Sequence, residues 1–373
     1  MSRTHTPVNM AFLILLLICF SVKPVFSKPV FPEDENISEN TFSTESETKK
    51  TESKIITDKK NSNTLKKAEP LFQDQIEEPY NTFSGNTYLS YNDMKNFSDE
   101  NPFYILSAFL LAYPDKIRTT GYDFRAKDWF LITESGVRLY WAKGRILPEK
   151  SKDKYQEFKP YVFYLYPETP YSKESFSEKD IEYFKSDNFL NSRKQEPDYE
   201  FTLYEELFGI RNRQSVEQNL ETVYIFGIKT SVNKNIRLPL EKALEEINRQ
   251  AETSKEIKEF IDTISDVHGY NWRKIRDSDS MSYHSLALAF DLVPKNWDIE
   301  TIYWNWTRVF EEDWLTIPFK EKWAPPETVI EIFEKNGFIW GGKWDLWDNM
   351  HFEYRPELIL LQNLLKGKEQ AKK

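Results

Sequence analysis

The sequence has very little cysteine and histidine, and both shortages narrow the chemistry available to the chain. Its one cysteine, Cys19, lies within the first 27 residues. Beyond that point there is no thiol for a disulfide, a zinc ribbon, a redox motif or a cysteine nucleophile. The four histidines are His5, His268, His284 and His351. An imidazole-based site outside the N-terminal segment therefore has only three histidines to draw on.

Basic residues are also fewer than acidic ones. The chain has 50 lysines and arginines against 60 aspartates and glutamates, so its net charge is −10. A nucleic-acid partner requires a basic face, so we expect no nucleic acid partner. Aromatic residues, in contrast, make up 16% of the chain. Most of the tryptophans fall between Trp272 and Trp347, and their large buried areas predict a dense core in that region.

The N-terminus has the pattern of an export signal. A basic start is followed by the apolar run 11–22, and a cleavage site is expected after Ser27. A helix of that length spans ~18 Å, short of the ~30 Å hydrocarbon core of a bilayer. We therefore expect a cleaved signal over residues 1–27 and a periplasmic or cell-envelope location. An uncleaved membrane anchor and a lipoprotein modified at Cys19 are the alternatives, and the membrane is a partner only if the leader is retained.

Composition divides the rest of the chain into three segments. Residues 28–96 are rich in Glu, Ser, Thr, Lys and Asn, which predicts a disordered tether. Residues 97–235 have no motif that suggests chemistry, and their role stays open. An apolar helix is expected at 103–113, with strands at 129–133, 137–141, 161–165 and 223–228 and a charged surface segment at 172–199. Residues 236–373 contain helical periodicity and both motifs described below.

The first motif runs from Ser282 to Asp291 and contains His284. Asp291 follows His284 by seven positions, ~23 Å in extended chain or ~10 Å in helix, so both reach one metal only if the chain bends between them. The run 287–293 is apolar apart from Asp291, which predicts a buried strand with a single acid. A buried carboxylate is costly unless it is paired or binds a metal. Asp291 is therefore either a metal ligand or a residue that caps or salt-bridges within the fold.

The second motif contains Gly341-Gly342-Lys343-Trp344, followed by Asp348 and His351. A spacing of three places Asp348 and His351 on the same side of a helical turn. A strand is expected to follow, which would put His351 and Glu353 on one face. Glu353 is then either a partner that orients an imidazole or a surface acid. Two imidazoles and one carboxylate make a ligand set that leaves a zinc position open for water.

The motifs Ser-x-His-x6-Asp, Gly-Gly-x-Trp and Asp-x-x-His-Phe-Glu together resemble the D-alanyl-D-alanine carboxypeptidase family of zinc peptidases. That family is related to the vancomycin-resistance D-Ala-D-Ala dipeptidases and to phage L-alanyl-D-glutamate endolysins. The resemblance covers roughly residues 240–360. It implies one Zn²⁺ per chain, and the implied ligands are His284, Asp291 and His351. The family usually has glycine where this chain has Ala287, so the resemblance leaves open how the bend between the first two ligands is built.

The resemblance also implies roles for polar residues around the metal. Asp348 would be the general base, and Arg273 would steady the substrate's carbonyl or carboxylate. Arg276 competes with Arg273 for that role, and both Arg276 and Ser282 are expected to bind substrate. His268 has no counterpart in the motifs, and a single histidine near a helix end is more often structural or exposed than a ligand.

We therefore expect an α+β fold in which helices pack on a small antiparallel sheet that carries the zinc site, preceded by a β-rich N-terminal region. The resemblance implies a zinc peptidase that acts on peptidoglycan stem peptides, with no stable protein partner. Two alternatives stay open. One is an endopeptidase that cleaves L-Ala-D-Glu bonds or cross-links, and the other is a non-catalytic zinc-binding or wall-binding protein on the same scaffold.

Overall fold

The computed structural model describes residues 102–371, with gaps at 162, 193–196, 198 and 276–279. The expected export signal at 1–27, including Cys19, and the expected tether at 28–96 lie outside the described residues, as does Arg276. Among the helices that the structure describes, none combines the length and the apolar character that crossing a bilayer requires.

The chain has an α+β fold with small antiparallel sheets, which confirms the expected class. Two of the described sheets have four strands, in the orders β1-β2-β3-β4 and β7-β8-β10-β9, and β5 and β6 form a hairpin. The strands are β1 Ile117–Asp123, β2 Asp128–Thr133, β3 Arg138–Tyr140, β4 Leu147–Pro148, β5 Leu220–Ile225, β6 Ile228–Asn233, β7 Ile264–His268, β8 Ala289–Pro294, β9 Phe338–Trp340 and β10 His351–Tyr354.

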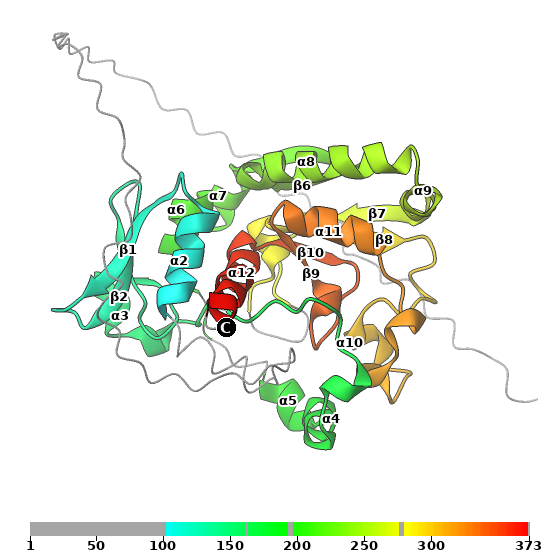
Figure 1. Cartoon of the computed structure of the whole chain (residues 1–373), viewed down its shortest axis with the longest axis horizontal. Coiled ribbons are helices and arrows are strands. Elements are labelled where there is room, and N and C mark those ends of the chain that lie inside the picture. Colours follow the sequence, from blue (N-terminus) through cyan, green and yellow to red (C-terminus); the bar gives the residue numbers. More distant parts are fainter. Residues whose placement is uncertain (1–101, 162, 193–196, 198, 276–279, 372–373) are drawn as a thin grey trace, which may run out of the picture. The chain divides into compact units, whose positions relative to one another are not determined.

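Helices flank these sheets, and in Figure 1 α12 lies beside α2 while α11 lies beside α8. The described α-helices are α2 Pro102–Ala112, α3 Glu149–Lys152, α4 Glu178–Lys185, α5 Asp187–Ser192, α6 Thr202–Phe208, α7 Arg213–Glu217, α8 Lys234–Ala251, α9 Lys255–Thr263, α10 Trp304–Thr307, α11 Glu327–Lys335 and α12 Pro356–Ala371. Short 3-10 helices include η3 Tyr283–Leu286 and η6 Gly341–Lys343.

The longest of the described helices, α8, follows from the apolar pattern of its sequence. Its apolar positions recur at helical spacing, and Leu240, Ala243, Leu244 and Ile247 are buried. The side chain of Asn233 accepts a hydrogen bond from the backbone N–H of Asn235 and caps the first turn. The predicted helix at 103–113 is likewise confirmed as α2.

Strand alternation in the β7-β8-β10-β9 sheet separates a packed face from a polar one. Phe290 on β8 stacks on Phe352 of β10 with ring centroids 5.4 Å apart, and Phe352 also packs on Phe333 of α11 at 4.6 Å. Because neighbouring residues on a strand point to opposite faces, Asp291 and His351 lie on the other side of the sheet. The aromatic core thus fixes which residues are presented at the polar face.

Two strand predictions in the N-terminal half need correction. The described residues of 161–165 form no strand, because Tyr161 and Phe163 stack on each other at 5.2 Å within the core without joining a ladder. The run 223–228 is not one strand, since Phe226 and Gly227 have φ of 51° and 82° and form the turn between β5 and β6. In both cases β-favouring residues serve side-chain packing or a turn.

The charged segment 172–199 is more than a surface excursion. It forms α4 and α5, and Phe184 and Phe189 are buried in a cluster with Trp304, Trp314 and Trp347. Because charged residues surround these two phenylalanines in the sequence, the apolar pattern that packs into the core was not recognised there. The larger core cluster likewise combines residues from Ile105 through Leu361, so the N-terminal and C-terminal halves share buried contacts.

Candidate metal centre

His284 is held by a short 3-10 turn and by one buried hydrogen bond. The hydroxyl of Ser282 accepts a hydrogen bond from the backbone N–H of His284 at 3.3 Å. The Nδ1 of His284 lies 2.8 Å from the carbonyl oxygen of Gly269. Because a carbonyl only accepts, this nitrogen carries a proton and Nε2 keeps its lone pair in the neutral ring. No motif in the sequence indicated that the carbonyl of Gly269 contacts His284.

The bend between His284 and Asp291 is built at Ala287. This residue has φ 56° and ψ 28°, the left-handed conformation that glycine adopts most readily. Its backbone N–H donates to the carbonyl of His284 at 3.0 Å, and its own carbonyl accepts from Asn233 at 2.8 Å. Alanine thus adopts the left-handed conformation that this bend requires, at a local cost of about 1–2 kcal/mol.

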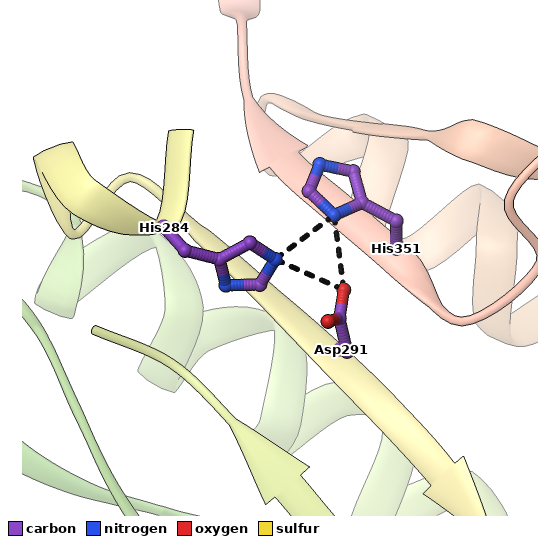
Figure 2. Close-up of side chains that lie close together, drawn as sticks. All are labelled: His284, Asp291 and His351. Carbon is purple, nitrogen blue, oxygen red and sulfur yellow. Dashed lines mark hydrogen bonds and ion pairs between the residues drawn. The ribbon is translucent and has the colours of Figure 1, made fainter. Parts of the chain in front are cut away.

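Asp291 and His351 come from neighbouring strands and face each other directly in the register of β8 and β10. The Nδ1 of His351 lies 2.9 Å from Oδ1 of Asp291. His284 completes the group, since its Nε2 lies 3.1 Å from Oδ1 of Asp291 and 3.2 Å from Nδ1 of His351. Figure 2 shows the three side chains pointing toward one another, two from strands and one from the preceding turn.

The donor set fits a cation. The Nε2 of His351 lies 3.2 Å from Oε2 of Glu353, and in a neutral ring that keeps its proton on this nitrogen, Nδ1 would present its lone pair to the cluster. With both rings neutral in this way, three acceptor atoms converge and no proton lies between them. A tetrahedral zinc ion with ~2.0 Å bonds would separate its ligand atoms by ~3.3 Å, close to the spacing found in this cluster. His284, Asp291 and His351 form a metal-type cluster among the described residues.

The pKa values of the ligands in the metal-free protein also show that the site favours a positive charge. Burial lowers the pKa of His351, but hydrogen bonds to Asp291 and Glu353 outweigh it and raise the value to about 10. Burial raises the pKa of Asp291, but the charge and hydrogen bond of His284, together with His351, hold it well below its usual range. A bound cation would satisfy the same carboxylate without protonating a ring.

Asp348 lies beside the cluster at the start of a turn. The N–H of His351 donates to the carbonyl of Asp348 at 3.2 Å, so a turn and not the expected helical turn brings the two residues together. Its Oδ1 is buried and has no hydrogen-bond partner among the described residues. Burial and the charge of Asp291 raise its pKa to about 7, against the opposing effects of His351, the Met350 N–H and Arg273.

The Gly-Gly motif makes room for Asp348. A Cβ on Gly341 would lie 2.7 Å from the carbonyl oxygen of Asp348, a separation that requires the backbone to shift. The carbonyl of Gly341 in turn accepts from the N–H of Asp348 at 3.0 Å. The glycine therefore allows the close backbone approach that places the carboxylate near the metal ligands.

The remaining predicted site residues differ in their exposure and in their contacts. Arg273 is exposed, and its charge acts on Asp348. Ser282 has a structural contact with His284, and its substrate-binding role stays a prediction. Glu353 is buried and contacts His351, which fits a residue that orients a ligand. His268 has a half-exposed side chain and pairs with Asp266 at 3.0 Å.

Comparisons with known proteins agree with this geometry over part of the chain. Residues 275–354 match the model of a family described as D-alanyl-D-alanine carboxypeptidase. Residues 105–163 match a domain of unknown function. No curated protein and no solved structure gives a significant match. The family match and the His-Asp-His cluster together support a metallopeptidase domain in the C-terminal part of the chain.

Proposed function

We propose that the protein is an exported zinc-dependent peptidase that hydrolyses cell-wall peptides containing D-amino acids, in the manner of a D-Ala-D-Ala carboxypeptidase. The observation that carries the proposal is the convergence of three lone-pair donors beside a buried carboxylate oxygen of Asp348 that has no hydrogen-bond partner among the described residues. The three ligands account for metal binding, and the additional carboxylate would account for catalysis. A protein that only bound zinc would have no use for a costly buried acid at that position.

The side chains would divide the work as follows. His284, Asp291 and His351 would hold the zinc ion. When bound, the ion supplies Lewis-acid chemistry, which polarises the scissile carbonyl and acidifies a water molecule. Asp348 would accept the proton of the attacking water and transfer it to the leaving amine. Its raised pKa, about 7 in the metal-free protein, suits a group that must both take and return a proton.

Arg273 would bind the substrate. Its exposed guanidinium lies close enough for its charge to act on Asp348. A guanidinium offers paired donors to a terminal carboxylate or to the developing oxyanion. The match to a D-alanyl-D-alanine carboxypeptidase family supports a substrate that ends in D-alanine. The basic and apolar N-terminal pattern supports export to the periplasm or cell envelope, where such peptides occur.

Defined muropeptides distinguish the kinds of peptidase. The purified full chain is loaded with zinc, incubated with stem peptides, and the products are followed by mass spectrometry. Release of one terminal D-alanine, abolished by a chelator, is the result expected of a carboxypeptidase. Internal cleavage would move the assignment to an endopeptidase. Absence of cleavage by folded, zinc-loaded protein would contradict the peptidase proposal and favour a binding protein.

A further inference from the structure

A chain of buried charges leads away from the metal centre along β10. Glu353 contacts His351 through Oε2, and its other oxygen, Oε1, lies 3.5 Å from Nη1 of Arg355. The Nε of Arg355 then donates to Glu357 in the first turn of α12. Glu353, Arg355 and Glu357 are 6%, 2% and 2% exposed. His351 and Glu353 lie two positions apart on β10 and therefore point to the same side of the strand, and Arg355 and Glu357 continue the charged chain beyond the end of the strand.

This charged chain ends at the N-terminal segment. The hydroxyl of Tyr113, just after α2, donates to Oε2 of Glu357 at 2.9 Å. Burial and the charge of Glu357 raise the pKa of Tyr113 well above its usual range, so the hydroxyl stays a donor. The guanidinium of Arg355 lies between the rings of Tyr161 and Tyr283, 5.4 Å from each centroid. Tyr113 and Tyr161 both belong to the segment that matches a domain of unknown function.

Packing alone does not explain such a network. Burying alternating charges costs desolvation, and apolar residues of similar volume usually fill such a space at least as well. A network of buried charges fixes the positions of its side chains, because each charged group is fully hydrogen-bonded in only one arrangement with its partners. Glu353 has two such partners, the ligand His351 on one oxygen and Arg355 on the other. The position of Arg355 therefore sets how Glu353 meets the imidazole.

We propose that the 105–163 segment is a positioning element of the metal centre, in which Tyr113 and Tyr161 act through Arg355 and Glu357 to hold Glu353 against His351. The inference rests on the proposed role of His351 as a zinc ligand. It assigns the domain of unknown function a task within the peptidase. Loss of a residue that orients a metal ligand commonly lowers metal affinity by about 10–100-fold. Tyr113 is four contacts away from the imidazole, so a smaller effect is expected.

The test compares two buried tyrosines that each donate to a glutamate. Tyr113→Phe removes the hydroxyl at Glu357, and Tyr166→Phe removes the hydroxyl that lies 2.5 Å from Oε1 of Glu334. Tyr166 contacts α11 and β9 and no member of the charged chain in the described hydrogen bonds. The zinc dissociation constant is measured by competition with a chromophoric chelator, using Zn²⁺ alone and full-length protein. The melting temperature of each metal-free variant is measured in parallel.

We expect Tyr113→Phe to weaken zinc binding by about 3–10-fold, while Tyr166→Phe stays within about twofold of wild type. Both variants should lower the melting temperature of the metal-free protein. Equal zinc affinity in both variants, whether unchanged or weakened alike, would overturn the proposal, because the network would then act only on stability. Glu357→Gln should weaken zinc binding more than Tyr113→Phe, and if it does not fold, Tyr113→Phe decides.

The outcome also separates this inference from the proposed function. Wild-type protein that binds zinc, together with an unaffected Tyr113→Phe variant, would overturn the positioning role alone. Wild-type protein that binds no zinc would overturn both.

Discussion

Asp291 and His351 are direct partners in the antiparallel pairing of β8 with β10, and Oδ1 of Asp291 lies 2.9 Å from Nδ1 of His351. Two of the three candidate ligands are therefore fixed by the sheet itself, and the phenylalanines behind them hold that sheet in place. Only His284 reaches the site from a turn. A site built mainly on strands holds its ligands more precisely than a site built on loops.

Replacing Asp348 separates metal binding from catalysis. Asp348→Asn keeps the shape of the side chain but removes the base, so zinc should still bind while kcat falls by about 10²–10⁴-fold. Asp345→Asn, in the same loop, is the matched control and should keep most of the activity. Turnover with a defined stem peptide and zinc content are measured on the same preparations. Full activity of Asp348→Asn would remove this residue from its catalytic role.

The histidines differ in their expected effect on zinc content. His351→Ala removes a ligand and leaves Asp291 and His284 with an incomplete set, so zinc and activity should be lost together. His268 also faces Asp291 in the β7–β8 register, but its ring pairs with Asp266. His268→Ala should therefore retain stoichiometric zinc by elemental analysis. Stoichiometric zinc in His351→Ala would exclude His351 from the ligand set.

Zinc binding should release a proton. In the metal-free protein the pKa of His351 is about 10, so at about pH 8 its ring is protonated, whereas zinc needs the Nδ1 lone pair. Asp348, with a pKa of about 7, is mostly ionised at that pH and contributes little. Calorimetric titrations in buffers of different ionisation enthalpy should show release of about one proton. Binding enthalpies that do not depend on the buffer would contradict this charge state.

The same raised pKa predicts the pH dependence of metal-free stability. Because the folded-state pKa of His351 lies above its unfolded value, the associated stabilisation is fully present below about pH 6.5 and is lost as pH rises through about 10. The melting temperature of the metal-free protein should fall over that window, and the fall should be smaller in His351→Gln. An identical fall in both proteins would assign it to other groups.

Substitutions of Ala287 test whether the backbone is strained at the bend between His284 and Asp291. Ala287→Gly relieves about 1–2 kcal/mol of backbone strain but loses a buried methyl group, about 0.8 kcal/mol, and gains unfolded-chain entropy. The free energy of unfolding should therefore change by less than about 1 kcal/mol. Ala287→Val adds a branched side chain at φ 56° in a fully buried position and should cost more than about 2 kcal/mol. Denaturant unfolding of the metal-free proteins measures both, and a tolerated valine would contradict the strained geometry.

The α+β class and the strand that carries Asp291 could be predicted from the sequence, because hydrophobic period and an isolated acid in an apolar run are local signals. The resemblance pointed to the residues that the structure brings together. The turn between Asp348 and His351 was mistaken for a helical turn, since a spacing of three fits both. No local pattern indicated that Tyr161 lies in the core beside Arg355 and not in a strand, because that contact joins residues far apart in the chain.

The same limit applies to the network behind the metal centre. Glu353 could be proposed as a partner of His351 from strand alternation alone. Tyr113 and Glu357 are 244 positions apart, and no pattern in either segment indicates their hydrogen bond. Contacts of this kind require the tertiary structure.

Removal and return of the metal is the decisive experiment for a zinc peptidase. Purified full-length protein is stripped with a chelator, titrated with Zn²⁺, and assayed at each step for hydrolysis of a stem peptide that ends in D-Ala-D-Ala. We predict no activity without metal, activity that rises in proportion to bound zinc, and a plateau at about one zinc ion per chain. Undiminished hydrolysis by the stripped protein, or a plateau in bound zinc reached without any hydrolysis, would contradict a zinc-dependent peptidase.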